Sequence, residues 1–321
     1  MKSLFAGLAL MAITATAHAA IPFADGESVT FKNSQSFKLH ALVFKAENPK
    51  AVLVAIHGMQ SHSGWFLSGP ELAERGITTL AYDRRGSGLS EGQRGHAYTS
   101  EDFLDDLAAA VREAKLLAPG LPIHLHANCF GVRIAIPYVV HKDVSSEIRS
   151  VIFTAPGVAM AKKADYSFSE RLCIPFIDNG IASGNCAQLS PRPFYVRSPL
   201  EDELFVSSGP WLTDFVNSDE YALRELTAGF LMATNKLTAQ MNADIAPQGG
   251  HQGSAFKTPM LMILGSSDVM VNNAKIDQLL YNVHPGQKQR LVLPCQHGLE
   301  FCGESGVQQY RDAMVNWILS H

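Results

Sequence analysis

The 321-residue sequence lacks the signatures of several large protein classes. Its 26 basic and 30 acidic residues give a formal net charge of −4 without a basic stripe, so nothing points to nucleic-acid binding. It has no zinc-site spacing, phosphate loop or dinucleotide fingerprint, and Gly86-Ser87-Gly88 lacks the helix-opening glycine of such a fingerprint. We therefore expect neither metal nor cofactor. A hydrophobic content of 46% fits a globular enzyme, and the sequence leaves its oligomeric state open.

The N-terminus has the pattern of an export signal. Lys2 precedes an apolar run over residues 4–13, and Ala17-His18-Ala19 forms an A-x-A cleavage site. The run is shorter than the ~20 residues that a membrane span needs, and no later segment is apolar enough to span a bilayer. We predict cleavage after Ala19 and export to the periplasm or medium; an N-terminal membrane anchor is the alternative.

Export would place the five cysteines in an oxidising compartment. Two local bridges, Cys173 with Cys186 and Cys295 with Cys302, would leave Cys129 as the odd thiol. The alternative is a set of reduced, buried cysteines.

Strand-like and helix-like segments alternate along most of the chain. We expect strands at 28–32, 37–45, 51–56, 77–82, 123–128, 151–154, 259–265 and 289–293, and helices at 70–75, 100–117, 131–141, 273–281 and 307–319. This alternation predicts an α/β fold with a mostly parallel sheet flanked by helices. It stops after Gly157 and resumes at Pro259. We therefore predict a core of residues 20–157 and 257–321 and a mainly helical cap, or lid, over 158–256.

The sharpest local signal is the turn between the strand at 123–128 and the helix that follows. The run Ala127-Asn128-Cys129-Phe130-Gly131 has the form of the nucleophile elbow Gly-x-Ser-x-Gly, with alanine at the first glycine and cysteine at the serine. An elbow lifts Cys129 beside a helix N-terminus, which favours a thiolate. An inert buried thiol is the plainer interpretation.

Two further residues complete a catalytic set. Cys129, Asp268 and His297 each follow a predicted strand, and the carboxyl ends of strands in open α/β sheets form the ligand crevice. The order nucleophile, acid, histidine fits a triad in which His297 moves the proton and Asp268 orients the ring. Solvated loop positions are the alternative for Asp268 and His297. The N–H groups of Phe130 and Met59 are expected to form the oxyanion hole.

Two strips resemble those of monoacylglycerol lipases and lysophospholipases. Ile56-His57-Gly58-Met59-Gln60-Ser61-His62-Ser63 resembles their HGxxxHS strip, and residues 82–92 resemble their D-x-RGxGxS-x-G strip. Asp268 and His297 stand where that family has its acid and histidine. The resemblance covers nearly the whole mature chain and implies an α/β-hydrolase core, a cap and ester-directed chemistry.

The chain departs from that family at Cys129. A thiol suits activated esters, thioesters, lactones and acyl transfer better than plain oxygen esters. Attack on a plain oxygen ester would have to give a thioester while expelling an alkoxide, which is a poor leaving group. We expect hydrolysis of an ester, thioester or lactone with an apolar acyl part, with an acyltransferase or a non-catalytic binding protein as alternatives.

Binding residues are harder to assign from the sequence. His57, Trp211 and Phe215 are the expected contacts with a small-molecule or lipid-like acyl substrate, and the alternative for the aromatic pair is a plain helical core. Arg84 and Arg85 either bind an acidic group or fix the loop after Asp83.

Overall fold

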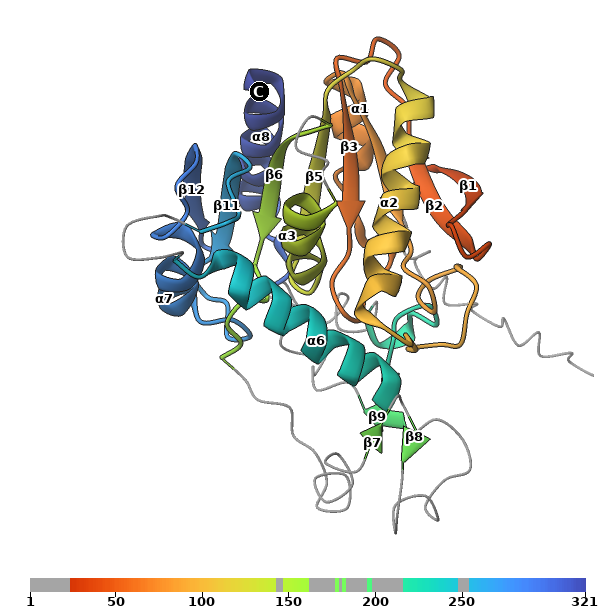
Figure 1. The fold of residues 1–321 in the computed structure, drawn as a ribbon. Helices are drawn as coiled ribbons and strands as arrows, with labels where there is room; N and C mark the ends of the chain where they lie inside the picture. Colours follow the sequence, from red (N-terminus) through yellow and green to blue (C-terminus); the bar gives the residue numbers. More distant parts are fainter. Residues whose placement is uncertain are drawn as a thin grey trace, which may run out of the picture.

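The computed structural model describes residues 24–142, 147–161, 216–247 and 254–321, and the backbone of three short strands at 177–178, 181–182 and 195–197. An eight-stranded sheet runs in the order β1-β2-β4-β3-β5-β6-β11-β12 (Figure 1). Its strands are β1 (Glu27–Lys32), β2 (Lys38–Phe44), β3 (Ala51–Ile56), β4 (Ile77–Tyr82), β5 (Ile123–Asn128), β6 (Ile148–Thr154), β11 (Met260–Gly265) and β12 (Lys288–Leu293). β2 is antiparallel to both neighbours and the other pairs are parallel, which confirms the predicted α/β class.

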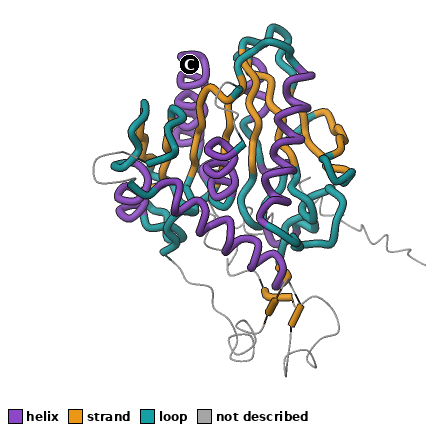
Figure 2. Tube along the Cα trace, in the orientation of Figure 1, coloured by secondary structure: helices purple, strands orange, loops and turns teal. Residues whose placement is uncertain are grey.

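Helices cover both faces of the sheet (Figures 1 and 2). On one face lie α2 (Ser100–Leu117) and α3 (Gly131–His141), and α6 (Ala228–Ile245) crosses them near the carboxyl ends of the strands. On the other face lie α1 (Gly69–Glu74) and α8 (Glu304–Ser320). The carboxyl edge of the sheet, where ligands bind in such folds, therefore lies beside α6.

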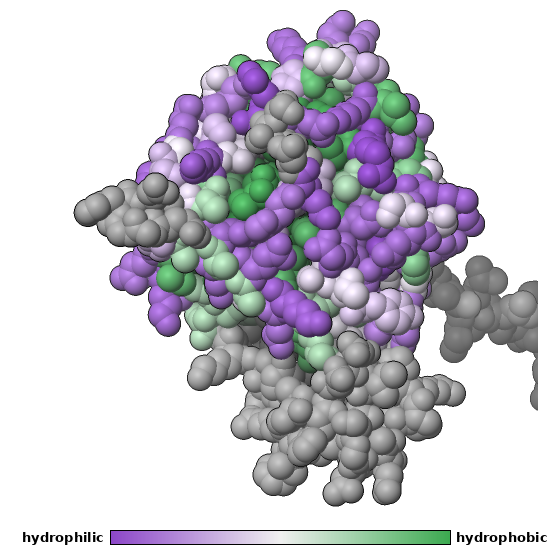
Figure 3. All heavy atoms as spheres, in the orientation of Figure 1, coloured by the Kyte–Doolittle hydropathy of each residue, from purple (hydrophilic) through white to green (hydrophobic). Residues whose placement is uncertain are grey.

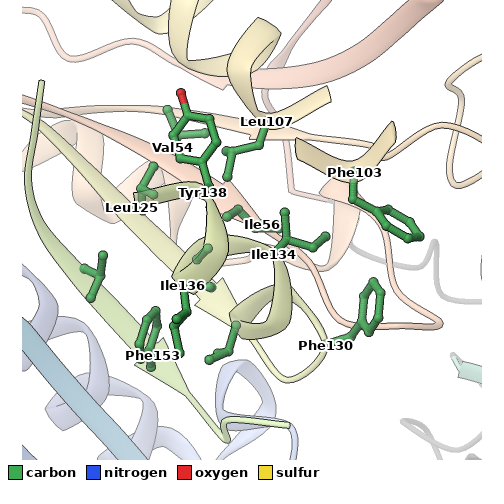
Figure 4. Packing of buried hydrophobic residues seen from close by; sticks show 14 of the residues in the cluster. Val54, Ile56, Phe103, Leu107, Leu125, Phe130, Ile134, Ile136, Tyr138 and Phe153 are labelled. Atoms are coloured by element: carbon green, nitrogen blue, oxygen red, sulfur yellow. The ribbon is translucent and has the colours of Figure 1, made fainter. Parts of the chain in front are cut away.

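The burial pattern of the central strands explains this layering. β3, β4 and β11 are buried at every position, as expected for parallel strands covered on both faces. Alternate side chains feed two cores, one under α2 and α3 and one under α1 and α8. Figure 4 shows part of the first core, in which Val54, Leu125 and Phe153 from three strands pack toward Ile134 and Tyr138 of α3.

Local signals set the helix limits. Thr99 caps α2 by accepting from the backbone N–H of Asp102, whose side chain in turn accepts from the Thr99 N–H. The helix predicted at 273–281 is divided into α7 (Asn273–Ile276) and a π-helical turn (Asp277–Tyr281).

The segment expected to be a mainly helical cap contains strands as well as α6. Two short antiparallel pairs form there, β7 (Ile177–Asp178) with β8 (Ile181–Ala182) and β9 (Tyr195–Arg197) with β10 (Glu225–Thr227). Among the described helices, none is long and apolar enough to cross a membrane. The face in Figure 3 is mostly hydrophilic, with hydrophobic residues in small areas between hydrophilic ones. The predicted signal segment lies outside the described residues.

Candidate active site

Cys129 occupies the sharp turn between β5 and α3. Its φ angle is 45°, in the left-handed region that a side chain other than glycine rarely adopts. Two backbone hydrogen bonds hold the turn: the Cys129 N–H donates to Thr154 O at 3.0 Å, and its carbonyl accepts from the Gly157 N–H at 2.9 Å. A Cβ at Gly131 would lie 2.7 Å from Ile56 O, so that position needs glycine. The turn thus has the geometry of a nucleophile elbow, as the sequence predicted, with Cys129 free and buried at its tip.

Asp268 and His297 come from the loops after β11 and β12, and these loops are tied to each other. The N–H groups of Ser266 and Ser267 donate to the carbonyls of Leu293 and Cys295 at 2.8 and 3.0 Å. The expected disulfide between Cys295 and Cys302 is present and closes the loop that carries His297. Cys173 and Cys186 lie outside the described residues.

The structure brings the three predicted catalytic residues together. His297 Nδ1 lies 2.8 Å from Asp268 Oδ2, and the imidazole lines the same cavity as Cys129. Asp268 Oδ1 accepts from the Met270 and Val271 N–H groups at 2.7 and 3.2 Å, which fixes the carboxylate. Burial opposes a charge on the ring, but a Cys129 thiolate and the hydrogen bond to Asp268 raise the pKa of His297 to about 10. The arrangement therefore favours the protonated form of His297.

The first strip, which continues from the end of β3 to Ser63, lies against the Cys129 turn. A Cβ at Gly58 would lie 3.6 Å from Cys129 Cβ, so the strip passes close to the thiol. Arg84 Nη2 donates to the carbonyls of Gly58 and Met59 at 2.9 and 3.0 Å. Within the described residues, the N–H groups of Met59 and Phe130 pair with no other protein group. Both are therefore available to a ligand.

The two arginines of the second strip are engaged within the protein. Arg84 is fully buried, with its guanidinium 4.9 Å from the centre of the Phe130 ring. Arg85 donates to both oxygens of Asp106 and pairs with Asp102. Of the two roles considered for them, the contacts support the structural one.

His57 lines the cavity, but its ring nitrogens are already used. Nε2 accepts from the Arg84 N–H at 3.1 Å, and Nδ1 faces Gly58 O at 2.8 Å. Burial and the Arg84 charge hold its pKa well below the ordinary value, so the ring is neutral. It has only its ring surface to offer a substrate. Trp211 and Phe215, the other expected contacts, lie outside the described residues.

Sequence reasoning missed two supporting residues of these strips. Asp83 Oδ1 accepts from the Ser63 N–H at 2.6 Å, and Oδ2 accepts from the Leu89 N–H at 2.9 Å, so one carboxylate joins both strips. His62 Nε2 lies 2.8 Å from Asp219 Oδ2, which links the first strip to the segment that leads into β10. Asp83 and His62 both stand in the quoted motifs, which were the signal available.

A cavity of about 70 Å³ opens beside Cys129 and His297. Its apolar wall consists of Trp65, Phe66, Leu299 and Phe301. An acyl group attached to the thiol would therefore meet apolar side chains at once.

The family described as serine aminopeptidase, S33, matches residues 47–299, most of the chain. The chain belongs to this family. An uncharacterized abhydrolase domain-containing protein of Dictyostelium discoideum is 25% identical over 272 residues, which cover 84% of this S33 family chain and 26% of the relative. A phospholipase of Bacillus subtilis is 26% identical over 123 residues, covering 38% of the chain and 46% of the relative. The chain thus spans between a quarter and a half of the length of these relatives.

Solved structures establish the fold of this S33 family member. A monoacylglycerol lipase of Paleococcus ferrophilus superposes with a TM-score of 0.65 at 19% identity, covering 88% of this chain and 99% of the lipase. A monoglyceride lipase variant of Saccharomyces cerevisiae superposes with a TM-score of 0.72 at 15% identity, covering 93% of this chain and 95% of the lipase. The chain therefore has the α/β-hydrolase fold that the motifs implied.

Proposed function

We propose that the chain is an acyl hydrolase that carries the acyl group on Cys129 as a thioester. Its substrates are esters, thioesters or lactones with an apolar acyl part. One observation carries the proposal: a thiol at a strained strand–helix turn lines the same cavity as His297, whose Nδ1 is fixed by Asp268. Nucleophile, base and orienting acid in this relation are the parts that covalent acyl transfer needs.

The reaction divides into two steps. The Cys129 thiolate attacks the carbonyl carbon, and the electron pair of the C=O bond moves to the oxygen, which the Met59 and Phe130 N–H groups bind. The C–X bond breaks, and the leaving group takes the proton from His297 Nε2, the ring nitrogen that Asp268 does not use. Water then attacks the thioester while His297 takes a proton from the water. The C–S bond breaks, which releases the acid product and regenerates the Cys129 thiolate.

The substrate class rests on the cavity and on the relatives. The cavity wall beside the thiol contains Trp65, Phe66 and Phe301, which suit an apolar acyl chain. The names phospholipase and monoacylglycerol lipase among the relatives favour ester substrates with lipid-like acyl groups. Cysteine favours those members of the class with good leaving groups, because a thiolate is itself a good leaving group from the tetrahedral intermediate.

Trapping the acyl group tests the proposal directly. Wild-type protein mixed with p-nitrophenyl acetate should show a burst of p-nitrophenol and a mass increase of one acetyl group on the peptide containing Cys129. Cys129→Ala should abolish both, and burst or labelling that persists in Cys129→Ala refutes the mechanism. Cys129→Ser should retain the fold, and a higher rate on plain oxygen esters would show how far the thiol restricts the substrate.

The role of His297 needs its own control. His297→Gln should slow acylation by at least about a hundredfold. His284→Gln is the matched variant, because His284 is another buried histidine and does not line the cavity. Faster product release on adding an alcohol or hydroxylamine would make acyl transfer to that acceptor the reaction in place of hydrolysis.

We also propose that residues 1–19 are removed on export and that residues 158–256 form a cap over the site. The A-x-A pattern supports export, and the Cys295–Cys302 disulfide suits an oxidising compartment. The mass of protein recovered from the periplasm or medium tests cleavage: a mature chain beginning at Ala20 is expected, and an intact Met1 contradicts it.

A further inference from the structure

One serine of the first strip lies beside the thiol. Ser61 Oγ is 3.3 Å, and Cys129 Cβ is 3.6 Å, from the point where a Cβ on Gly58 would lie. Gly58 directly precedes Met59, whose N–H group is a donor of the proposed oxyanion hole. Ser61 and Cys129 also line the same cavity. The Ser61 hydroxyl is therefore a neighbour of both the thiol and this oxyanion donor.

The Ser61 hydroxyl is unpaired and can be reached from the cavity. Within the described residues, no hydrogen bond joins Ser61 Oγ to another group, and the atom is not fully buried. Ser87 of the second strip is the contrasting case, because its Oγ is also unpaired but is fully buried and does not line the cavity. Ser61 is only 8% exposed, so the little surface that it keeps belongs to the cavity wall.

The backbone around Ser61 is anchored on both sides. The carbonyl of Gln60 accepts from the Leu223 N–H at 2.8 Å, and His62 Nε2 lies 2.8 Å from Asp219 Oδ2. A hydroxyl on a fixed backbone is already in place when negative charge develops beside it. Such preorganised donors stabilise a transition state without a cost of reorganisation.

We propose that the Ser61 hydroxyl is a third donor of the oxyanion hole, and so a catalytic residue. When the Cys129 thiolate adds to the substrate carbonyl, a C–S bond forms and the electron pair of the C=O bond moves to the oxygen. The Met59 and Phe130 N–H groups donate to two lone pairs of that oxygen. The Ser61 O–H donates to the third lone pair and keeps its proton throughout. The inference rests on the proposed function and adds a residue to its mechanism.

The rate of acylation tests this role. Ser61→Ala should form the acyl-enzyme from p-nitrophenyl butanoate about 10- to 100-fold more slowly than wild type, with little change in KM, because a donor that acts in the transition state is lost. Ser87→Ala is the matched control and should acylate like wild type. Should Ser61→Ala fail to fold, Ser61→Gly also lacks the hydroxyl and replaces it. Acylation at the wild-type rate without the Ser61 hydroxyl, or an equal loss in Ser87→Ala, overturns the proposal.

A transition-state analogue separates this role from packing. Propyl trifluoromethyl ketone has no leaving group, so the Cys129 thiolate adds to its carbonyl and the adduct remains an oxyanion. Ser61→Ala should bind this ketone more weakly by about the factor that it loses in acylation. Methyl propyl ketone, which lacks the activating fluorines, should inhibit wild type and Ser61→Ala equally.

Equal losses for both ketones, or unchanged inhibition by the fluorinated one, contradict the assignment of Ser61. Failure of the proposed function has a different result, because wild-type protein would then show no acylation of Cys129.

Discussion

Arg84 Nη2 lies 2.9 Å from the carbonyl oxygen of Gly58, so a fully buried guanidinium holds the strip that passes beside the thiol. The next carbonyl, that of Met59, accepts from the same nitrogen. A peptide group whose carbonyl is fixed also has its N–H direction fixed, since the group is planar. Arg84 is therefore a positioning residue for the proposed oxyanion hole.

Replacing Arg84 should damage turnover more than binding. In Arg84→Met the Gly58 and Met59 carbonyls lose a shared donor, and the Met59 N–H loses its fixed direction. We expect kcat for a p-nitrophenyl ester to fall by about 10- to 100-fold with little change in KM, less than the loss of a whole oxyanion donor.

Arg94 provides the matched control for that substitution. Its guanidinium also donates to two backbone carbonyls, those of Gly88 and Tyr221, but it does not line the cavity. Arg94→Met should lower the melting temperature and leave kcat near that of wild type. Equal losses of kcat in both variants would mean that Arg84 acts through general stability alone.

The disulfide beside His297 gives a second prediction. Cys295 and Cys302 are seven residues apart, and a loop of that length contributes about 2–3 kcal/mol in the chain-entropy account. In Cys295→Ala/Cys302→Ala the free energy of unfolding, measured by urea titration, should be lower by about that amount. It should also acylate more slowly well below its melting temperature, because the loop then holds His297 less firmly. Unchanged stability contradicts the first part.

A thiol count checks the remaining pairing. Denatured, unreduced protein should react with one equivalent of maleimide if Cys173 and Cys186 are also bridged, since Cys129 is then the single free thiol. Three equivalents would mean that only Cys295 and Cys302 are joined.

The sequence was sufficient wherever one short segment determines its own structure. The limits of β3, β4, β5, α2 and α3 agree with the prediction. β3 is an unbroken apolar run and α2 begins with a capping box, and both of these signals are local. The proposed triad could also be read from the sequence, since each member follows a strand and the carboxyl ends of parallel strands share one edge.

What escaped prediction depends on contacts between distant segments. No local pattern shows that Asp83 joins two strips, or that Ala55, Ala81 and His126 stand in one row, because register brings them together. The strands β7 to β10 were missed for a related reason: two- and three-residue strands carry too little periodicity to be recognised.

Asp83 predicts a dependence of stability on pH. Burial opposes its charge, but the hydrogen bonds to His40 and from the Leu89 N–H lower its pKa from 3.8 to about 2. A carboxyl whose folded pKa is depressed stabilises the protein above its unfolded pKa and loses that contribution as the pH falls toward the folded value. The loss should therefore fall between about pH 4 and pH 2, and amount to about 1 kcal/mol by pH 3. Urea unfolding at several pH values should give a flatter curve for Asp83→Asn than for wild type; parallel curves would contradict the assignment.

The link between His62 and Asp219 predicts where the segment before β10 is anchored. Asp219 Oδ2 accepts from Trp65 Nε1 at 2.5 Å and lies 2.8 Å from His62 Nε2, in a carboxylate that is almost fully buried. Asp219→Ala should cost about 2 kcal/mol and make residues 216–227 easier to cleave with a protease, because His62 of the first strip and Trp65 just after it lose a shared acceptor. Asp277→Ala is the control, since Asp277 forms an equally well-aligned pair with Arg290 on the surface, where such pairs contribute about 0–1 kcal/mol. Limited proteolysis followed by mass spectrometry distinguishes the two, and equal cleavage of the segment in both variants would show that Asp219 does not anchor it.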